Sequence, residues 1–138
     1  MAALSITAAN VAASTGAKIA AGTGGETFVQ GKSMALNATT GEWMLGQCDG
    51  TTSEAGLSGV GVALNAGGDG QPIDVQTEGE ITIGATVTVG AIYCLGATAG
   101  DIVPFGDLVS TNKITILGVG ISTAKIKLLP IYSGVAVP

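Results

Sequence analysis

Ser122 and Lys125 are separated by two residues, the spacing of the S-x-x-K signature in enzymes with a serine nucleophile. That chemistry places the serine at the start of a helix and the lysine one turn later. Here the neighbouring residues alternate between polar and apolar, which predicts a strand, and side chains three positions apart in a strand face opposite sides. The companion motifs S-D-N and K-T-G do not occur in the sequence. We therefore expect Ser122 and Lys125 to be exposed strand residues.

Two other short motifs match a ligand site and a modification site. The run Gly67–Gly70, with the sequence GGDG, is similar to the start of a calcium-binding nonapeptide. It occurs once, and Pro72 stands where the second acidic ligand would be needed. Asn37-Ala38-Thr39 has the pattern of a glycosylation acceptor, which carries meaning only in a secreted protein. We expect ordinary turns at both places.

Asp101 and Asp107 flank Pro104 and Phe105 and form a carboxylate pair that could in principle do acid and base chemistry. Both fall on predicted loops, and the chain contains neither histidine nor arginine. Histidine is the commonest general base and metal ligand, so its absence argues against catalysis. We predict no enzymatic activity, no metal site and no cofactor, and expect both aspartates to be solvated or to cap turns.

The balance of charge argues against nucleic acid as a partner. Ten carboxylates oppose five lysines, which gives a net charge of −5. Proteins that bind DNA or RNA neutralise phosphates with clustered lysine and arginine, and an acidic chain without arginine repels them. We predict that the protein does not bind nucleic acid.

The N-terminus and the hydropathy pattern argue against secretion and against a membrane. Residues 1–22 are rich in alanine but lack a basic start, and Ser5, Thr7 and Asn10 interrupt the apolar run, so no signal peptide is predicted. No segment approaches the ~20 apolar residues needed to span a bilayer. We expect a soluble protein made in the cytoplasm, without a membrane partner.

The segment Gly59–Phe105 has the clearest pattern in the chain, short alternating apolar runs between glycine-bearing turns. Ile73 and Val75 alternate with polar residues, and Ile81 with Ile83 and Val87 with Val89 repeat the period of two. The pattern predicts several β-strands with one buried and one solvated face.

Strands are also predicted on both sides of this segment. Residues 27–30, 33–36 and 42–48 are predicted as strands, the last two as a hairpin, and residues 113–119 and 123–129 as a second hairpin. The tail 130–138 is expected to form an edge strand, since Pro130 lacks a donor. Strict alternation predicts two facing sets in the second hairpin: Ile114, Ile116, Ile126 and Leu128 inward, and Lys113, Thr115, Lys125 and Lys127 outward.

The cysteines and most aromatic residues are expected in the interior. Cys48 and Cys94 lie in apolar segments, where a free cysteine behaves as a small hydrophobe, so we predict two reduced, buried thiols. Five scattered aromatics do not make a base-stacking platform, and we expect core or subunit-interface positions for them, with Trp43 covering a core. They are Phe28, Trp43, Tyr93, Phe105 and Tyr132.

Many short strands with frequent turns predict an all-β fold, a small β-barrel or β-sandwich. Residues 1–24 are small and weakly patterned, and end in a Gly-rich stretch at Gly22–Gly25 that can act as a hinge. We therefore divide the chain into a flexible N-terminal arm, residues 1–24, and a β-barrel-like domain, residues 25–138.

The order and spacing of several glycine and valine segments resemble those of the small decoration, or cement, proteins of tailed-bacteriophage heads. The resemblance covers residues 26–138. The segments that carry it are Gly59–Leu64, Gly70–Pro72, Gly84–Gly90, Ile92–Leu95, Ala99–Pro104 and Ser133–Ala136.

The resemblance implies a homotrimer that binds the major capsid protein on the outer surface of the expanded head. It implies a place at threefold and quasi-threefold positions in the virion, where the protein stabilises the shell against the pressure of packaged DNA. It also implies that the protein is made in the cytoplasm of a bacterial host. A trimer presents three copies of the arm, so residues 1–17 are the candidate contact. The candidate capsid-binding residues are Ala2, Ala3, Leu4, Ser5, Ile6, Thr7 and Val11.

An alternative is a tail-fibre or adhesion module whose glycine-rich loops bind a glycan on the host surface. Such modules usually carry clustered surface aromatics that stack on sugar rings. Five scattered aromatics argue against this alternative.

Overall fold

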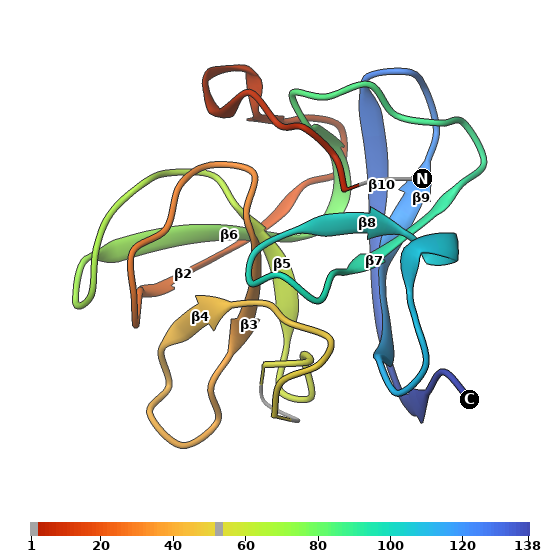
Figure 1. The fold of residues 1–138 in the computed structure, drawn as a ribbon. Helices are drawn as coiled ribbons and strands as arrows, with labels where there is room; N and C mark the ends of the chain where they lie inside the picture. The colour runs from red at the N-terminus through yellow and green to blue at the C-terminus, as the bar shows by residue number, and fades with distance from the viewer. Residues whose placement is uncertain (1–2, 52–53) are drawn as a thin grey trace.

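The computed structural model describes residues 3–51 and 54–138, and these residues form an all-β fold (Figure 1). Two short 3-10 turns, η1 (Ala8–Asn10) and η2 (Phe105–Asp107), accompany ten strands in the described chain. The strands are β1 (Ala12–Ala13), β2 (Lys18–Thr23), β3 (Ser33–Leu36), β4 (Trp43–Leu45), β5 (Val60–Ala63), β6 (Pro72–Thr82), β7 (Ile92–Leu95), β8 (Ile102–Pro104), β9 (Lys113–Gly120) and β10 (Lys125–Ala136).

The strands form one antiparallel sheet that curls into a half-barrel. Its order is β4-β3-β5-β6-β10-β9-β7-β8, and β1 and β2 add to β6 outside this path. Strand β6 is the hub, because it pairs with β2 and β5 along its first part and with β1 and β10 along its second part. Figure 1 shows β6 crossing from the group of β2 to β5 towards the long pair β9 and β10.

A bend divides β6 into these two parts. Gly79 adopts a φ of +88°, which glycine reaches without a Cβ penalty. The fully buried Gln76 holds the bend from inside, since its Nε2 donates to the carbonyl oxygens of Glu78 at 3.1 Å and Glu80 at 2.8 Å. Its Oε1 is buried without a hydrogen-bond partner among the described residues.

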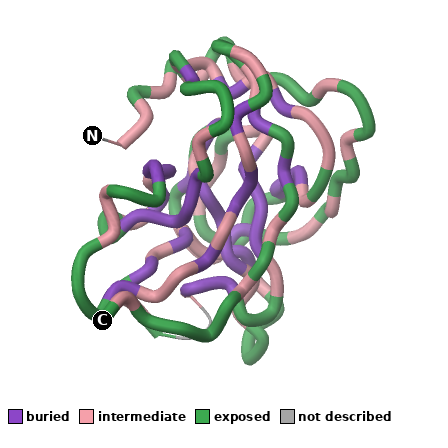
Figure 2. Tube along the Cα trace, turned by 90° about the vertical axis from the view of Figure 1, so that its right-hand side faces the viewer, coloured by how far each residue is buried: buried purple, intermediate pink, exposed green. Residues whose placement is uncertain are grey.

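Each part of β6 belongs to its own apolar core. The smaller core gathers Phe28, Met34, Trp43, Ala63, Ile73 and Val75 around β3, β4, β5 and the first part of β6. The larger core lies under the second part of β6 and strands β7 to β10, and includes Ile81, Ile83, Tyr93, Leu95, Ile102, Leu117, Ile126 and Leu128. Figure 2 shows the buried segments running through the middle of the molecule beneath exposed turns.

Several expectations from the sequence are confirmed. The fold is all-β, β3 and β4 form the predicted hairpin with Met34 opposite Leu45, and β9 and β10 form the second one. Trp43 is buried over the smaller core. Cys48 and Cys94 are buried free thiols.

The predicted inward face of the second hairpin is correct for Ile126 and Leu128 but wrong for β9. Thr115 and Leu117 are fully buried, whereas Ile114 and Ile116 are only partly buried. Leu128 pairs with Gly118 and Ile131 pairs with Ile116, so two residues of β10 oppose the single residue 117. On its other side, β9 pairs Gly118 with Tyr93 and Ile116 with Cys94, so Leu117 is an extra residue of β9 relative to β7. This β-bulge leaves Leu117 and Gly118 both buried and turns Thr115 inward, where its hydroxyl donates to the carbonyl oxygen of Ala55.

Three predicted strands differ in extent from the structure. Residues 27–30 contribute only an isolated bridge between Phe28 and Gly67, and residues 87–89 form no strand, although Val87 is buried. The tail is not a separate strand, because β10 continues through Pro130 to Ala136. Beyond Leu128 it pairs with β9 alone, so Pro130 does lie at a sheet edge.

The N-terminal residues also differ from the flexible arm that we expected. Strand β2 is hydrogen-bonded along β6 from the pair Lys18 and Glu78 to the pair Thr23 and Pro72. The expected hinge glycines are held in place, since Gly22 lies in β2 and Gly24 forms a bridge with Trp43. Residues 3–24 are thus packed on the domain rather than separate from it.

Candidate functional site

The candidate site is the segment of residues 3–16, which we call the strap, together with the groove in which it lies. The backbone N–H of Leu4 donates to the carbonyl oxygen of Ile102 in β8 at 2.9 Å, and that of Thr7 donates to Gly84 at 2.8 Å. Strand β1 then pairs with the end of β6. The strap therefore runs across the open side of the half-barrel, from β8 to β6.

Three glycines of the body make the floor of this groove. A Cβ at Gly31 would lie 2.5 Å from Cγ2 of Ile6, and a Cβ at Gly84 would lie 2.5 Å from the carbonyl oxygen of Thr7. A Cβ at Gly79 would lie 2.3 Å from the carbonyl oxygen of Gly16. These distances are far shorter than van der Waals contact, so the strap lies this close only because the three side chains are hydrogen.

The two sides of the strap differ in character. Leu4, Ile6 and Val11 are partly buried and pack on the larger core, while Ser5 and Thr7 are exposed. Alternation of this kind is typical of an extended segment with one face on a core. The strap therefore closes the larger core and presents its polar residues outward.

The seven candidate capsid-binding residues thus divide into three groups. Leu4, Ile6 and Val11 face this protein's own core, so their side chains are occupied. Ser5 and Thr7 are exposed, and Ala3 is half-buried at the start of the described chain. Ala2 lies outside the described residues.

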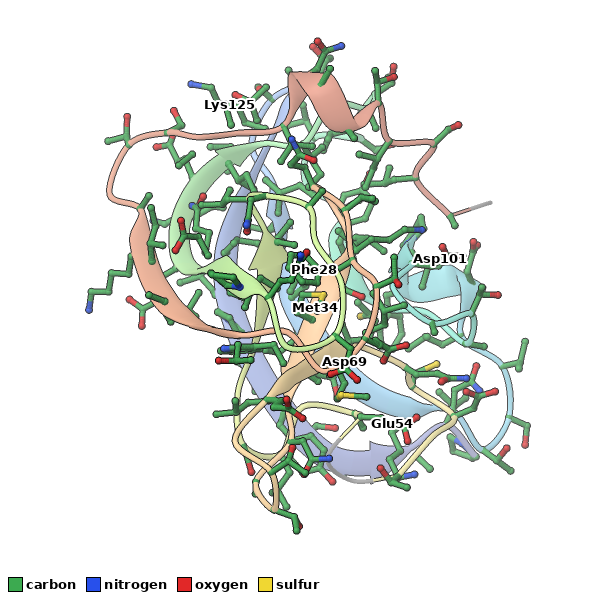
Figure 3. The ribbon with its side chains drawn as sticks, turned by 90° about the vertical axis from the view of Figure 1, so that its left-hand side faces the viewer. Phe28, Met34, Glu54, Asp69, Asp101 and Lys125 are labelled. Carbon is green, nitrogen blue, oxygen red and sulfur yellow. The ribbon has the colours of Figure 1, made fainter. Side chains whose placement is uncertain are left out.

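A polar contact fixes the second end of the strap. The Nζ of Lys125 donates to the hydroxyl of Ser14 at 3.1 Å and lies 4.0 Å from Oε1 of Glu80. The backbone N–H of Ser14 donates to the carbonyl oxygen of Glu80 at 2.9 Å. Figure 3 shows Lys125 at the same end of the molecule as the strap. Because Lys125 and Glu80 are part-exposed, this ion pair contributes about 0–1 kcal/mol.

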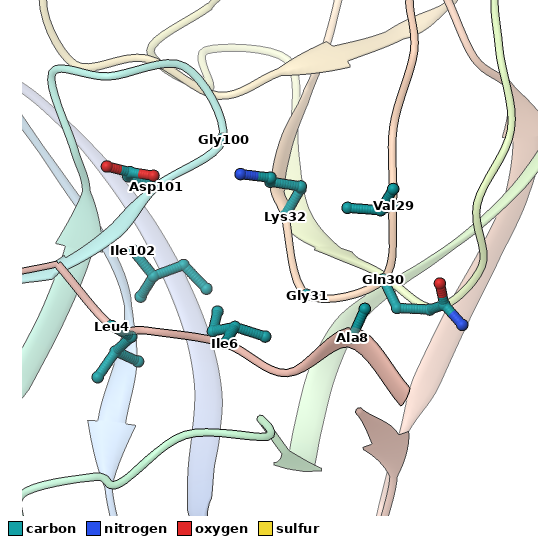
Figure 4. A pocket seen from close by; sticks show the side chains of 10 residues that line it. All are labelled: Leu4, Ile6, Ala8, Val29, Gln30, Gly31, Lys32, Gly100, Asp101 and Ile102. Carbon is teal, nitrogen blue, oxygen red and sulfur yellow. The ribbon is translucent and has the colours of Figure 1, made fainter. Parts of the chain in front are cut away.

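A small cavity of about 90 Å³ lies between the strap and the body. Leu4 and Ile6 of the strap, with Ile102 and Val29, supply its apolar lining. Lys32 and Asp101 line it from the two neighbouring loops, as Figure 4 shows. The space is well below the ~300–1,000 Å³ of ordinary ligand pockets, so the cavity is a packing gap rather than a substrate site.

The S-x-x-K motif differs from the pair of exposed strand residues that we expected, because Ser122 lies in a turn, Lys125 begins β10, and both are partly buried. The hydroxyl of Ser122 accepts hydrogen bonds from the backbone N–H groups of Ala124 at 3.2 Å and Lys125 at 3.1 Å. The amine of Lys125 binds Ser14 instead. Ser122 therefore stabilises the turn between β9 and β10.

The other short motifs of the sequence, at Asn37 and Gly67–Gly70, also form local turns. The Oδ1 of Asn37 accepts from the backbone N–H groups of Thr39 and Thr40, an Asx turn. In the Gly67–Gly70 run, the N–H of Gly68 is bound by the side chain of Gln71 at 2.8 Å. Asp101 precedes β8, and Asp107 ends η2. Among the described residues, no group of three or more Cys, Asp or Glu side chains could hold a metal ion.

Three of the five aromatics are buried, and their positions give no stacking platform. Phe28, Trp43 and Tyr93 are in the two cores, and the Tyr93 hydroxyl accepts from the N–H of Thr88 at 2.9 Å. Phe105 is exposed and Tyr132 is partly exposed. The residues come from separate elements.

The two thiols are shielded by the fold. Burial, reinforced by the nearby Cys48, raises the pKa of Cys94 from 9.0 to about 11, and burial followed by the charge of Asp49 raises the pKa of Cys48. Since the thiolate is the reactive form, both thiols should be inert while the protein is folded.

This shift predicts a loss of stability in alkali. A thiol whose pKa is higher in the folded protein ionises first in the unfolded chain, so its stabilising effect is complete below pH 9.0 and is lost as the pH rises through about 11. The loss attributable to Cys94 should be about 2–3 kcal/mol. Urea unfolding across this pH range should show it for the native chain, and Cys94→Ala should remove most of it. Equal pH profiles for the two proteins would contradict the prediction.

Sequence reasoning did not find the residues that hold the strap. Gly31, Gly79 and Gly84 are three of 23 glycines, and nothing local marks them as a groove floor. Lys125 and Glu80 are 45 residues apart in sequence and meet only through the pairing of β10 with β6. Only the sheet register could have revealed these contacts.

Comparison of the chain with models of known protein families and with curated proteins finds no match. In the part of the chain that the structure describes, no helix has the length and apolar character needed to cross a membrane.

Proposed function

We propose that this protein is a head decoration protein of a tailed bacteriophage, which binds the outside of the expanded capsid as a homotrimer and clamps neighbouring major capsid subunits. Its positions would be the threefold and quasi-threefold sites, and its effect would be to stabilise the shell against the pressure of the DNA. The resemblance of residues 26–138 to such proteins is the starting point for this proposal.

The observation that carries the proposal is the number of large apolar side chains left in solvent. Eleven of them are exposed among the described residues of a chain with only 6107 Å² of accessible surface. Three of them, Leu129, Ile131 and Val135, lie on one face of β10, in the part that pairs with β9 alone, and exposed apolar side chains gathered in this way favour a protein that functions inside an assembly. The eleven side chains are Ile19, Val29, Leu57, Val89, Ile92, Phe105, Val109, Ile121, Leu129, Ile131 and Val135.

The strap would supply the contact with the major capsid protein through its outward residues. Ser5 and Thr7 are exposed, while the backbone N–H groups of Leu4 and Thr7 and the neighbouring apolar side chains hold the strap to the body. A strap ordered in advance loses little further entropy on docking, which a free arm would lose. We therefore assign the contact to Ser5, Thr7 and Ala3, and a structural role to Leu4, Ile6 and Val11.

Threefold symmetry would make weak strap contacts sufficient. A single contact with millimolar affinity corresponds to about −4 kcal/mol. Joining such contacts in one trimer raises the overall affinity by about 10² to 10⁴ without any new interaction. Binding to the expanded shell alone then stabilises that state by linkage.

Cosedimentation with expanded heads stripped of decoration tests the proposal. The native trimer should bind saturably, and S5R/T7R should reduce binding at least tenfold because both arginines project from the outward side of the strap. The matched control is A38R/T39R, which adds the same charge at the exposed turn between β3 and β4, at the other end of the molecule (Figure 1). The proposed role of the strap fails if both variants bind like the native chain.

The alternative, a glycan-binding adhesion module, gains no specific support from the structure. Its expected signature is a cluster of exposed aromatics, and Phe105 is the one large aromatic exposed among the described residues.

A further inference from the structure

We propose that the strap is exchanged between copies of this chain, so that residues 3–16 of one protomer fill the groove of a neighbouring protomer. The inference rests on the homotrimer of the proposed function, but not on its binding to a capsid. The partner in the groove is a second copy of this chain, because the groove is shaped for this sequence.

The groove recognises the strap through features that do not depend on which chain supplies it. Gly31, Gly79 and Gly84 admit strap atoms at distances that any Cβ would forbid. The carbonyl oxygens of Ile102, Gly84 and Glu80 accept from strap N–H groups. All of these partners lie at least 15 residues away in sequence, so an identical strap from another copy would make the same contacts, apart from that of Gly79 with Gly16 at the end of the strap.

The connection between strap and body has the form of a hinge. Ala13 pairs with Ile81 and Lys18 pairs with Glu78, so four strap-side residues, 14–17, lie opposite only residues 79 and 80. The surplus forms a bulge at Gly16, which has a φ of +73° and nothing within 4 Å of a Cβ placed there, while its carbonyl oxygen lies against Gly79. Straightening this bulge would swing the strap away from its own body without breaking β2 from β6.

The strap is long enough to reach a neighbour. Fourteen extended residues span about 45 Å. A compact domain of this length has a radius of gyration of about 14 Å, so the released strap exceeds the distance from its hinge to the surface of an adjacent copy.

Exchange would slow the dissociation of the oligomer. In each exchanged groove, Leu4, Ile6 and Val11 of one copy would complete the larger core of the next. Protomers could then separate only by withdrawing these side chains from a core, which makes dissociation slow. A cyclic trimer closes such a chain of exchanges without leaving an empty groove.

A disulfide trap tests the exchange directly. Ala12 and Thr82 are register partners in the pair of β1 with β6, and neither residue is fully buried, so the variant A12C/T82C can form a bond between strap and groove without disturbing the core. The native mass of the purified protein is measured first. The protein is then oxidised and run on a denaturing gel without reductant. A short bismaleimide that bridges the same two thiols provides a second, independent trap.

Exchange predicts covalently linked dimers and trimers that disappear on reduction. The native chain, whose thiols are buried, and the single variants A12C and T82C are the controls, and should give no closed trimer. A trimer by native mass whose crosslinks are all within one chain would overturn the exchange while leaving the homotrimer in place. A monomer by native mass with crosslinks within one chain would overturn both.

Discussion

A variant that lacks residues 1–16 is expected to lose about 3–5 kcal/mol of unfolding free energy, a large part of the roughly 5–15 kcal/mol of a typical domain. Half-burial of Leu4, Ile6 and Val11 contributes about 1 kcal/mol each. The hydrogen bonds from Leu4, Thr7 and Ser14 contribute about 1 kcal/mol more in total, and the larger core becomes open to water. Urea unfolding followed by Trp43 fluorescence measures the loss.

The matched control removes only the outward side chains of the strap. S5A/T7A deletes two exposed hydroxyls and should leave the free energy of unfolding within about 0.5 kcal/mol of the native value. A free energy of unfolding for the truncated chain equal to that of the native chain would mean that the strap does not close the core. The comparison also bears on binding experiments, because truncation is expected to destabilise the domain, whereas S5R/T7R leaves the buried side chains of the strap in place.

The second large effect is expected at the bend of β6. Gly79→Ala should lower the unfolding free energy by about 3 kcal/mol, in two parts. About 1 kcal/mol comes from placing alanine at a φ of +88°. A further 2 kcal/mol or so comes from the overlap of its Cβ with the backbone of Gly16, which must move.

Gly70→Ala isolates the conformational cost of placing alanine at a positive φ. Gly70 has a φ of +82° and no atom within 4 Å of a Cβ placed there, so only the conformational cost of about 1 kcal/mol applies. Chemical denaturation of both variants gives the difference between them. Equal losses would show that the strap does not lie against Gly79.

The elements that the sequence predicts well are those with a regular period and a nearby partner. The hairpin of β3 and β4 follows from two alternating runs around the turn at Asn37, and β9 with β10 follows in the same way. The buried thiols follow from their apolar neighbours, since cysteine in such a segment packs as a small hydrophobe.

The remaining features depend on contacts between residues distant in sequence. Thr115 faces inward because β9 carries an extra residue, Leu117, where it pairs with β7, and no pattern within residues 113–119 reveals that bulge. The strap resembles a free arm in sequence because its apolar residues are sparse. Its order comes from Gly31, Gly79 and Gly84, which lie 15 to 80 residues further along the chain.

The measurement that tests the central proposal most directly is binding of the native protein to two forms of the same phage shell, expanded heads stripped of decoration and unexpanded precursor shells. The proposal predicts saturable binding to the expanded heads, with three chains for each threefold and quasi-threefold position, and at least a hundredfold weaker binding to the precursor. Electron microscopy of the saturated heads should place the added density at those positions. Absence of binding to expanded heads, or equal binding to both forms, would contradict the proposed function.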